Sequence, residues 1–346
     1  MLISDFDYEL PEELIAQHPL ERRDASRMLV VERDAQRWRD SLFAELPAYL
    51  REGDLLVVNN TRVFPARLHG VREPTGGRVE LFLIREVGAD VWEALARPAR
   101  RLQPGARISF RDARLRAEVV EALDEGRRIL RFHSDAPLAS LIEEIGETPL
   151  PPYIKRDAGS LNSEDRERYQ TVYAERRGAI AAPTAGLHFT PQIMAEARAR
   201  GASIAEITLH VGYGTFEPVR VEDLSEHRVA AERFEITEEV AQLINETRAR
   251  KGRVVAVGTT TTRALEFASD ERGRVSAGSG YAELTITPGY RFRAIDALVT
   301  NFHLPRSSLL VLVSTFAGRE LVLAAYRHAV EARYRFYSYG DCMLIF

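Results

Sequence analysis

The stretch GAIAAPTAGLHFTPQIMAEARARGASIAEITLHVGYGTFEP, residues 178–218, decides the fold. It begins with a short apolar run at 179–182 and breaks into a polar loop at 183–189. Thr190 is a favourable N-cap and Pro191 suits the first helical position, so a helix is predicted over 192–200. Gly201 suits the residue just beyond that helix, and a second apolar strand is predicted at 204–211. Strand, loop, helix and strand together predict one βαβ unit.

Similar loops follow other predicted strands downstream. The strand predicted at 253–257 is followed by GTTTTR (258–263), and the strand at 297–300 by NFHLPRSS (301–308). Open α/β sheets bind ligands at the carboxyl ends of their strands, so we expect the functional site there. Further strands are predicted at 28–32, 54–59 and 284–286, and helices at 11–17, 42–50, 237–252, 264–267, 309–316 and 321–332.

Residues 63–149 have a different texture. Six strand-like runs, ARLHGV, GRVELFLI, VWEALA, ARISF, RLRAEVVEA and RRILRFH, are separated by turns that carry Gly and Pro. This pattern predicts a small antiparallel barrel or sandwich. The predicted fold class is therefore α/β: an open α/β/α layered domain, residues 1–62 and 150–346, with an all-β barrel domain, residues 63–149, inserted into it.

The composition is that of a globular protein without a membrane span. The chain has 346 residues and a net charge of −4, which argues against a binder that attracts nucleic acid over its whole surface. No apolar run approaches the roughly 18 residues that a membrane span needs. The single cysteine, Cys342, excludes a disulfide framework, and we expect a cytoplasmic protein. Residues 62–131 hold 15 arginines against 10 acidic residues, a local excess that weakly favours a phosphate-contacting face.

The loops after the strands carry several candidate chemical groups. The segment 258–263 predicts a helix N-terminus that could bind a carboxylate, a phosphate or ribose oxygens, although a threonine-rich cap without a ligand is the alternative. Gly212 and Gly214 lack the third glycine of a dinucleotide fingerprint, so we reject NAD. The loops also hold imidazoles and carboxylates that could act as acids, bases or ligand donors: His188, His210, His227, His303, Glu217, Glu266 and Asp341. No histidine pair has metal-ligand spacing, so a metal site is the minority hypothesis.

Long motifs then connect the chain to a known family. The segments APTAGLHFT (182–190), TLHVGYGTFEPV (208–219), VAVGTTTTRALE (255–266), LVTNFHLPRSSLLVLVSTFAG (298–318) and YRFYSYGDCMLI (334–345) closely resemble the S-adenosylmethionine:tRNA ribosyltransferase-isomerases. The N-terminal segments DFDYELPEELIAQHPLERRDASRML and VVNNTRVFPARL are similar to the same family. The resemblance covers essentially the whole chain in order.

The resemblance implies a reaction of queuosine biosynthesis. The ribosyl group of S-adenosylmethionine is transferred and isomerised onto the 7-aminomethyl-7-deazaguanine wobble base of tRNA, which gives epoxyqueuosine-tRNA and releases adenine and methionine. S-Adenosylmethionine is then a co-substrate, no metal is expected, and the partner is tRNA that carries the precursor base in its anticodon loop. We expect a monomer. Members of the family also pair an α/β domain with a β-barrel.

The resemblance also implies site residues, because a base must remove a proton next to the sulfonium and an acid should assist the departure of adenine. The catalytic candidates are His188, His210, Glu217, His303 and Asp341. The substrate-binding candidates are Thr184, Gly186, Gly212, Gly214, Thr259, Thr260, Arg263, Glu266, Asn301 and Arg306. The candidates for contacts with tRNA phosphates are Arg22, Arg23, Arg27, Arg62 and Arg67.

The chain departs from the family pattern at two positions. Asn60 stands where the family usually has an aspartate, and Ala230 stands where it often has a second histidine after His227. A relative that binds tRNA or a nucleoside but has lost turnover is therefore the alternative to an active enzyme. A metal-dependent hydrolase would require the histidines to share one ion.

Overall fold

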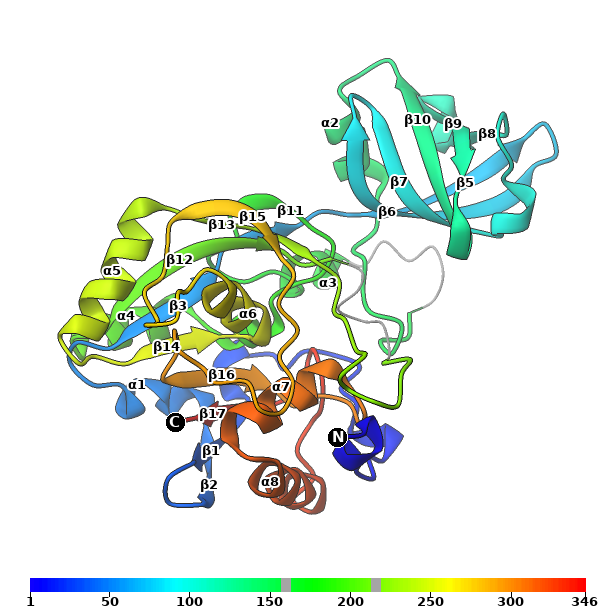
Figure 1. Ribbon diagram of the computed structural model, residues 1–346. Helices are drawn as coiled ribbons and strands as arrows, with labels where there is room; N and C mark the ends of the chain where they lie inside the picture. Colours follow the sequence, from blue (N-terminus) through cyan, green and yellow to red (C-terminus); the bar gives the residue numbers. More distant parts are fainter. Residues whose placement is uncertain (157–162, 213–218) are drawn as a thin grey trace.

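The computed structural model describes residues 1–156, 163–212 and 219–346, and it has two lobes (Figure 1). The larger lobe contains a nine-stranded sheet in the order β15-β13-β12-β3-β14-β16-β17-β1-β2. Its strands are β1 (Arg27–Glu32), β2 (Arg37–Leu42), β3 (Leu55–Asn59), β12 (Ser203–His210), β13 (Glu232–Ile236), β14 (Val254–Val257), β15 (Gly278–Ala282), β16 (Ala297–Asn301) and β17 (Cys342–Ile345). The central strands β12, β3, β14 and β16 are parallel. The pairs β12-β13, β13-β15, β16-β17 and β1-β2 toward the two margins are antiparallel, whereas β17 and β1 are parallel.

Helices cover both faces of this sheet. The strands β1, β3, β14, β16 and β17 are almost wholly apolar, and their residues alternate between two core clusters, as expected for strands buried on both sides. One cluster is covered by α1 (Leu46–Tyr49) and α4 (Pro191–Ala199). The other is covered by α5 (Glu238–Ala249), α6 (Thr259–Phe267), α7 (Ser308–Ala317) and α8 (Arg319–Glu331). The predicted α/β/α layering is therefore confirmed.

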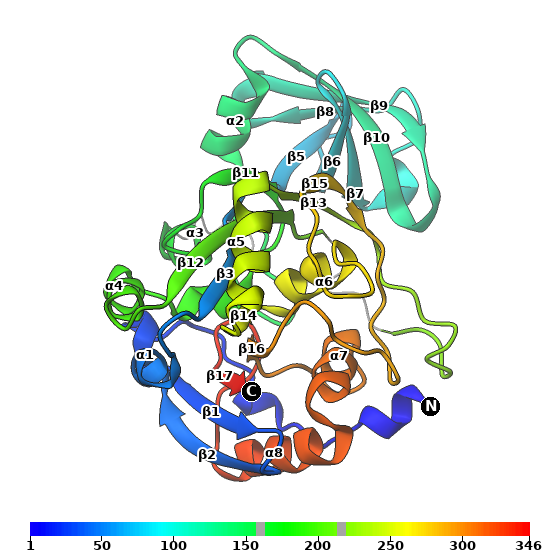
Figure 2. The same ribbon diagram turned by 60° about the vertical axis from the view of Figure 1, so that its left-hand side comes forward.

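The smaller lobe is a closed six-stranded antiparallel barrel in the order β10-β7-β6-β5-β8-β9. Its strands are β5 (Arg67–Glu73), β6 (Gly77–Gly88), β7 (Val91–Arg97), β8 (Arg107–Phe110), β9 (Leu115–Ala122) and β10 (Arg127–Ser134). All six predicted runs form these strands, and the barrel stands at one end of the α/β lobe, with α2 (Leu138–Ile145) against β10 (Figure 2). The division at residues 62/63 and 149/150 stays a prediction.

The helix predictions near the decisive stretch are confirmed by their caps. The Thr190 hydroxyl accepts a hydrogen bond from the backbone N–H of Ile193 at the start of α4, and Thr237 caps α5 in the same way. The predicted βαβ unit is wrong, because its first strand, β11 (Arg176–Ala179), pairs with β4 (Thr61–Val63) in a separate two-stranded sheet. Both neighbours of β12 in the main sheet are already taken, by β3 and β13.

Three other predictions fail locally. Residues 284–286 form no strand, since the carbonyl of Leu284 accepts a hydrogen bond from the Arg263 guanidinium instead of from a neighbouring strand. The helix predicted at 11–17 is only a 3₁₀ turn at Glu12–Leu14. The helix predicted at 42–50 is a 3₁₀ turn, Phe43–Glu45, followed by the single turn of α1. The other short elements are the 3₁₀ turns at Ile3–Phe6, Arg23–Ala25 and Thr184–His188, those of the barrel at Ala99–Arg101, Arg111–Ala113 and Asp124–Gly126, and the helix α3 (Ser163–Arg168).

In the part of the chain that the structure describes, no single helix is long and apolar enough to cross a membrane. Helices α7 and α8 meet that test only as a pair, and they are bent by 116° where they join.

Candidate active site

A pocket lies at the carboxyl ends of β12, β14 and β16, where an open α/β sheet places its ligands. The empty space there, counted together with adjoining open solvent, is about 540 Å³. Seven chain segments meet there: Tyr153, 181–185, Val211, 258–260, 300–303, Leu309 and 337–338. Five of the predicted site residues line it, namely Thr184, Thr259, Thr260, Asn301 and His303.

The N-terminus of α6 forms one wall of this pocket. Gly258 is its N-cap with a φ of 96°, a backbone conformation that favours glycine. Thr261 and Thr262 turn their hydroxyls back to the carbonyls of Val257 and Gly258. Thr259 and Thr260 instead line the pocket, beside first-turn N–H groups that have no partner within a helix. This wall is suited to bind an anionic group.

His303 provides a neutral imidazole on the opposite wall. The side chain is buried, and burial lowers its pKa to about 3. Its Nε2 lies 2.8 Å from the Thr300 hydroxyl. The backbone around it is fixed as well, since its N–H donates to the Tyr326 hydroxyl and its carbonyl accepts from Tyr8. The imidazole is therefore uncharged at neutral pH, with one ring nitrogen that carries no proton.

His188 lies behind Asn301 and does not line this pocket. Its Nδ1 is 2.9 Å from the Ser26 hydroxyl, and burial lowers its pKa to about 4, partly offset by the nearby Asn301 amide. Among the described residues, neither Nε2 of His188 nor Oδ1 of Asn301 has a hydrogen-bond partner of good geometry. The Asn301 amide donates to the carbonyl of Tyr337, 2.9 Å away. His188 therefore lies near Asn301 but lines a neighbouring cavity instead of this pocket.

Two aromatic residues of the pocket were missed by the sequence reasoning. The rings of Tyr153 and Tyr337 meet edge to face with centroids 3.9 Å apart, and the Tyr153 hydroxyl lies 2.5 Å from that of Ser338. Tyr337 has a φ of 74°, which is uncommon for a residue other than glycine and often occurs at functional sites. The quoted motif YRFYSYGDCMLI contained Tyr337, but only the fold brings Tyr153 to it.

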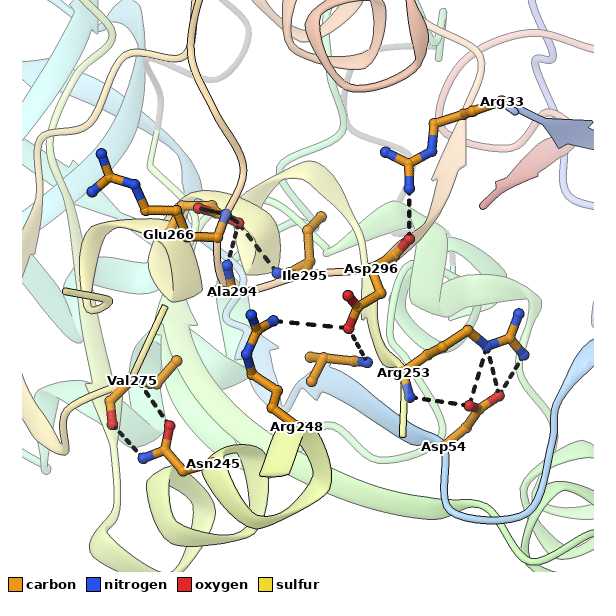
Figure 3. A network of polar contacts seen from close by, with 12 residues as sticks. Arg33, Asp54, Asn245, Arg248, Arg253, Glu266, Val275, Ala294, Ile295 and Asp296 are labelled. Carbon is orange, nitrogen blue, oxygen red and sulfur yellow. Dashed lines mark hydrogen bonds and ion pairs between the residues drawn. The ribbon is translucent and has the colours of Figure 1, made fainter. Parts of the chain in front are cut away.

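Three of the predicted site residues form hydrogen bonds or ion pairs within the protein and do not line the pocket. Arg263 is buried in an ion pair with Glu232, 2.6 Å away, and also donates to three backbone carbonyls. Figure 3 shows the Glu266 carboxylate facing the backbone N–H groups of Ala294 and Ile295, which donate to it. The two oxygens of Asp341 accept from the backbone N–H groups of Arg27 and Arg335. Their hydrogen-bonding capacity is largely used within the protein.

His210 supports the connection to the barrel. It is half-buried beneath the two-stranded sheet, with Nδ1 3.0 Å from the Thr61 hydroxyl, and burial lowers its pKa. Its ring lies against Gly178, where a Cβ would come within 2.5 Å of the imidazole. His227 lies elsewhere, at the start of α7, with Nε2 2.7 Å from the Ser308 hydroxyl. The structure therefore separates the four histidines into different environments.

The remaining predicted residues are scattered. Arg306 is exposed and forms an ion pair with Asp7, Gly186 packs against the Tyr173 hydroxyl, and Gly212 precedes the undescribed segment 213–218. Gly214 and Glu217 lie within that segment, outside the described residues.

The predicted phosphate-contacting arginines fall into two regions. Arg62 on β4 and Arg67 on β5 lie in grooves between the barrel and the α/β lobe, and Arg23 lines the same groove as Arg62. Arg22 and Arg23 lie near the N-terminus on the α/β lobe, whereas Arg27 is used internally, since its guanidinium stacks on the ring of Tyr334. No single basic face unites all five.

The two departures from the family pattern lie outside the pocket lining. The Asn60 amide donates to the Glu206 carboxylate, at 3.3 Å, and its carbonyl oxygen accepts from Thr208. Ala230 is exposed, and its backbone carbonyl accepts from Arg263. Within the described ranges, no group of three or more His, Cys, Asp or Glu side chains could hold a metal ion.

Comparisons with known proteins agree over the full length. A family model described as "Queuosine biosynthesis protein" matches residues 3–345. The chain is 52% identical to a protein of Symbiobacterium thermophilum and 51% identical to one of Pelotomaculum thermopropionicum, over 345 residues and 100% of each chain. Both are named S-adenosylmethionine:tRNA ribosyltransferase-isomerase. The crystal structure of the S-adenosylmethionine tRNA ribosyltransferase of Thermotoga maritima is 38% identical, with 99% of this chain and 100% of that chain covered and a TM-score of 0.56.

Proposed function

Because the chain belongs to the queuosine biosynthesis family of S-adenosylmethionine:tRNA ribosyltransferase-isomerases, we propose that its reaction takes place in the pocket at the ends of β12, β14 and β16. The chain is an enzyme of tRNA modification, a transferase and isomerase for which S-adenosylmethionine is a substrate. The single observation that carries the placement is that five motif residues from three separate segments converge in this pocket.

The pocket offers complementary groups for a charged sulfonium nucleoside. The N-terminus of α6, with Thr259 and Thr260, would bind the methionine carboxylate, because backbone N–H groups and the helix dipole favour an anion. The rings of Tyr153 and Tyr337 would hold a heteroaromatic base. With these assignments, one end of the pocket binds the carboxylate of the substrate and the other end binds its aromatic base.

His303 is the proposed proton acceptor. The carbon next to the sulfonium must lose a proton, and His303 lines the pocket with one ring nitrogen unprotonated. Because burial makes this imidazole a weak base, this role requires that its pKa rise toward neutral when the substrates bind. Asn301, whose amide donates to the carbonyl of Tyr337, would position a substrate polar group beside it. Because Arg263, Glu266 and Asp341 are engaged in the fold, we give them supporting rather than substrate-contacting roles.

Further aspects of the function are proposals of the same kind. We propose that the tRNA substrate presents a modified wobble base from its anticodon loop and that Arg22, Arg23, Arg62 and Arg67 approach its phosphates. We further propose that the protein acts as a monomer in the cytoplasm, without a metal ion. Light scattering at micromolar concentration tests the oligomeric state, and activity after exhaustive treatment with a chelator tests the metal.

The deciding experiment incubates the protein with S-adenosylmethionine and tRNA carrying the 7-aminomethyl-7-deazaguanine precursor. Adenine is followed by chromatography, and the modified nucleoside by mass spectrometry. Release of one adenine per modified tRNA supports the proposed reaction. If both substrates bind but no adenine appears, the binding-only relative is the better description.

A matched pair of variants tests the placement in the pocket. Thr260→Val removes a hydroxyl that lines the pocket, whereas Thr262→Val removes one that bonds only to the carbonyl of Gly258 one turn away. We expect the first to raise KM for S-adenosylmethionine roughly tenfold, as for the loss of one hydrogen bond to a charged group. The second should leave KM unchanged, and equal effects of both variants on KM would contradict the placement.

A further inference from the structure

Two guanidinium groups line a small cavity beside the proposed active site, and a third lies near it. Arg23 and Arg168 line this cavity together with His188 and Ser338, and its empty space, part of it open to solvent, is about 280 Å³. Ser338 also lines the active-site pocket, so the two spaces lie on either side of the same residue. The Arg335 guanidinium is close enough to His188 to lower the pKa of that imidazole. We call Arg23, Arg168 and Arg335 the arginine cluster.

The arginine cluster is bonded to backbone carbonyls rather than to carboxylates. Arg23 donates to the carbonyl of Leu187 at 3.2 Å and to that of Arg168 at 3.3 Å. Arg168 donates to the carbonyls of Glu21 and Leu20, and Arg335 donates to that of His18.

Within residues 1–156, 163–212 and 219–346, no carboxylate forms an ion pair with any of the three. The neighbouring acids do not neutralise the cluster. Both oxygens of Asp341 accept from backbone N–H groups, and Glu167 offers Arg23 its backbone carbonyl. Asp24, on the same loop as Arg23, pairs with Arg22.

Two N–H donors of the arginine cluster also lack a hydrogen-bond partner among the described residues. They are Nε of Arg168 and Nη1 of Arg335, and both are buried. Burial and the positive charge of Arg168 lower the pKa of Arg23. Glu167 and Asp341 act on Arg23 and Arg335 only as nearby negative charges, without forming an ion pair. Half-buried guanidinium groups without an ion-pair partner, beside donors that lack a hydrogen bond, are costly unless an anion binds to them.

We propose that the arginine cluster binds a phosphodiester phosphate of the tRNA strand next to the base that enters the active site. This inference rests on the proposed function and adds to it a second, separate contact point for the tRNA. Guanidinium groups match phosphate oxygens through paired N–H donors, and they are favoured for phosphate recognition. The carboxylate of S-adenosylmethionine already has a proposed partner at α6, on the other side of Ser338.

The test measures the affinity for tRNA as a function of KCl concentration for the wild type and Arg335→Gln. A phosphate contact contributes about one unit to the slope of log K against log salt, so the variant should lose about one unit of slope and roughly tenfold in affinity. Arg250→Gln is the matched control, because Arg250 is exposed at the end of α5 and the charge change is the same. We expect the control to keep the wild-type slope.

The outcomes separate this inference from the proposed function. An unchanged slope in Arg335→Gln, in a protein that still melts as the wild type does, overturns the phosphate site. A loss of affinity for S-adenosylmethionine with unchanged tRNA binding also overturns it, since the ligand would then be the substrate carboxylate. Arg23→Gln gives the same test if Arg335→Gln does not fold. Release of adenine by the wild type is measured separately, so absence of that activity counts only against the proposed function.

Discussion

Lowering the pH from 7 to 5 should destabilise this protein through two buried histidines. His188 and His303 are buried in the folded chain, and burial lowers their pKa values to about 4 and about 3. In the unfolded chain both should titrate near about 6.5. Between these values the unfolded chain binds more protons than the folded one, so stability falls as the pH falls.

The size of this loss of stability is set by the pKa of histidine in the unfolded chain, because at pH 5 both imidazoles of the folded chain are still almost fully neutral. Protonation of one histidine in the unfolded chain between pH 7 and pH 5 lowers the free energy of unfolding by about 2 kcal/mol. The two histidines together therefore account for about 4 kcal/mol, a large part of the roughly 5–15 kcal/mol of a typical protein. The full contribution is present above about pH 6.5 and is lost progressively toward the folded pKa values.

The assay is urea unfolding at pH 7 and pH 5 for the wild type, His188→Gln and His303→Gln. For each protein, the free energy of unfolding at pH 5 is subtracted from that at pH 7, so a variant's stability at pH 7 does not affect the comparison. This difference should be about 2 kcal/mol smaller in each variant than in the wild type. His133→Gln is the control, since its side chain on β10 is exposed. If His303→Gln keeps the full pH dependence of the wild type, the imidazole is not held neutral by burial, and the reasoning is refuted.

Three further predictions concern single positions. Asn60→Asp should cost about 1–3 kcal/mol in urea unfolding at pH 7, because the new carboxylate would face Glu206 without the amide donor; a stabilised variant would contradict this contact. Gly178→Ala should cost a similar amount, about 1–3 kcal/mol, because the new methyl group meets the ring of His210; its melting curve checks this, and an unchanged midpoint would show that the ring yields freely. Thr260→Ala should weaken binding of S-adenosylmethionine in calorimetry while the melting temperature changes by only a few degrees; a large loss of stability with unchanged binding would place the hydroxyl in the core.

The sequence predicted most of the elements, because their signals are local. Caps such as Thr190 and Thr237 were read from residue type and spacing alone, and the hydrogen bonds of both were found in the structure. The six barrel strands were visible as alternating runs between turns. The first strand of the decisive stretch was placed in the wrong sheet, since strand pairing depends on neighbours far away in the chain.

For the candidate site, too, the sequence predicted what depends on neighbouring residues and missed what depends on contacts between distant segments. Residue types and motif order placed Thr259, Thr260, Asn301 and His303 at strand ends, and the structure brings them into one pocket. Sequence alone could not separate Thr260 from Arg263, which lies one turn further along the same helix and forms a buried ion pair. It also gave no reason to join Tyr153 to Tyr337, which are far apart in the chain.

The amino-acid sequence by itself determined the class of the fold, the family and the segments that reach the site, because periodicity, caps and long motifs are properties of neighbouring residues. Only the tertiary structure decided which side chains face the pocket, which are consumed by internal hydrogen bonds, and which charges remain without a partner, as in the arginine cluster. The physical reason is that hydrogen-bond satisfaction and burial are set by contacts between distant segments, and these exist only once the chain has folded.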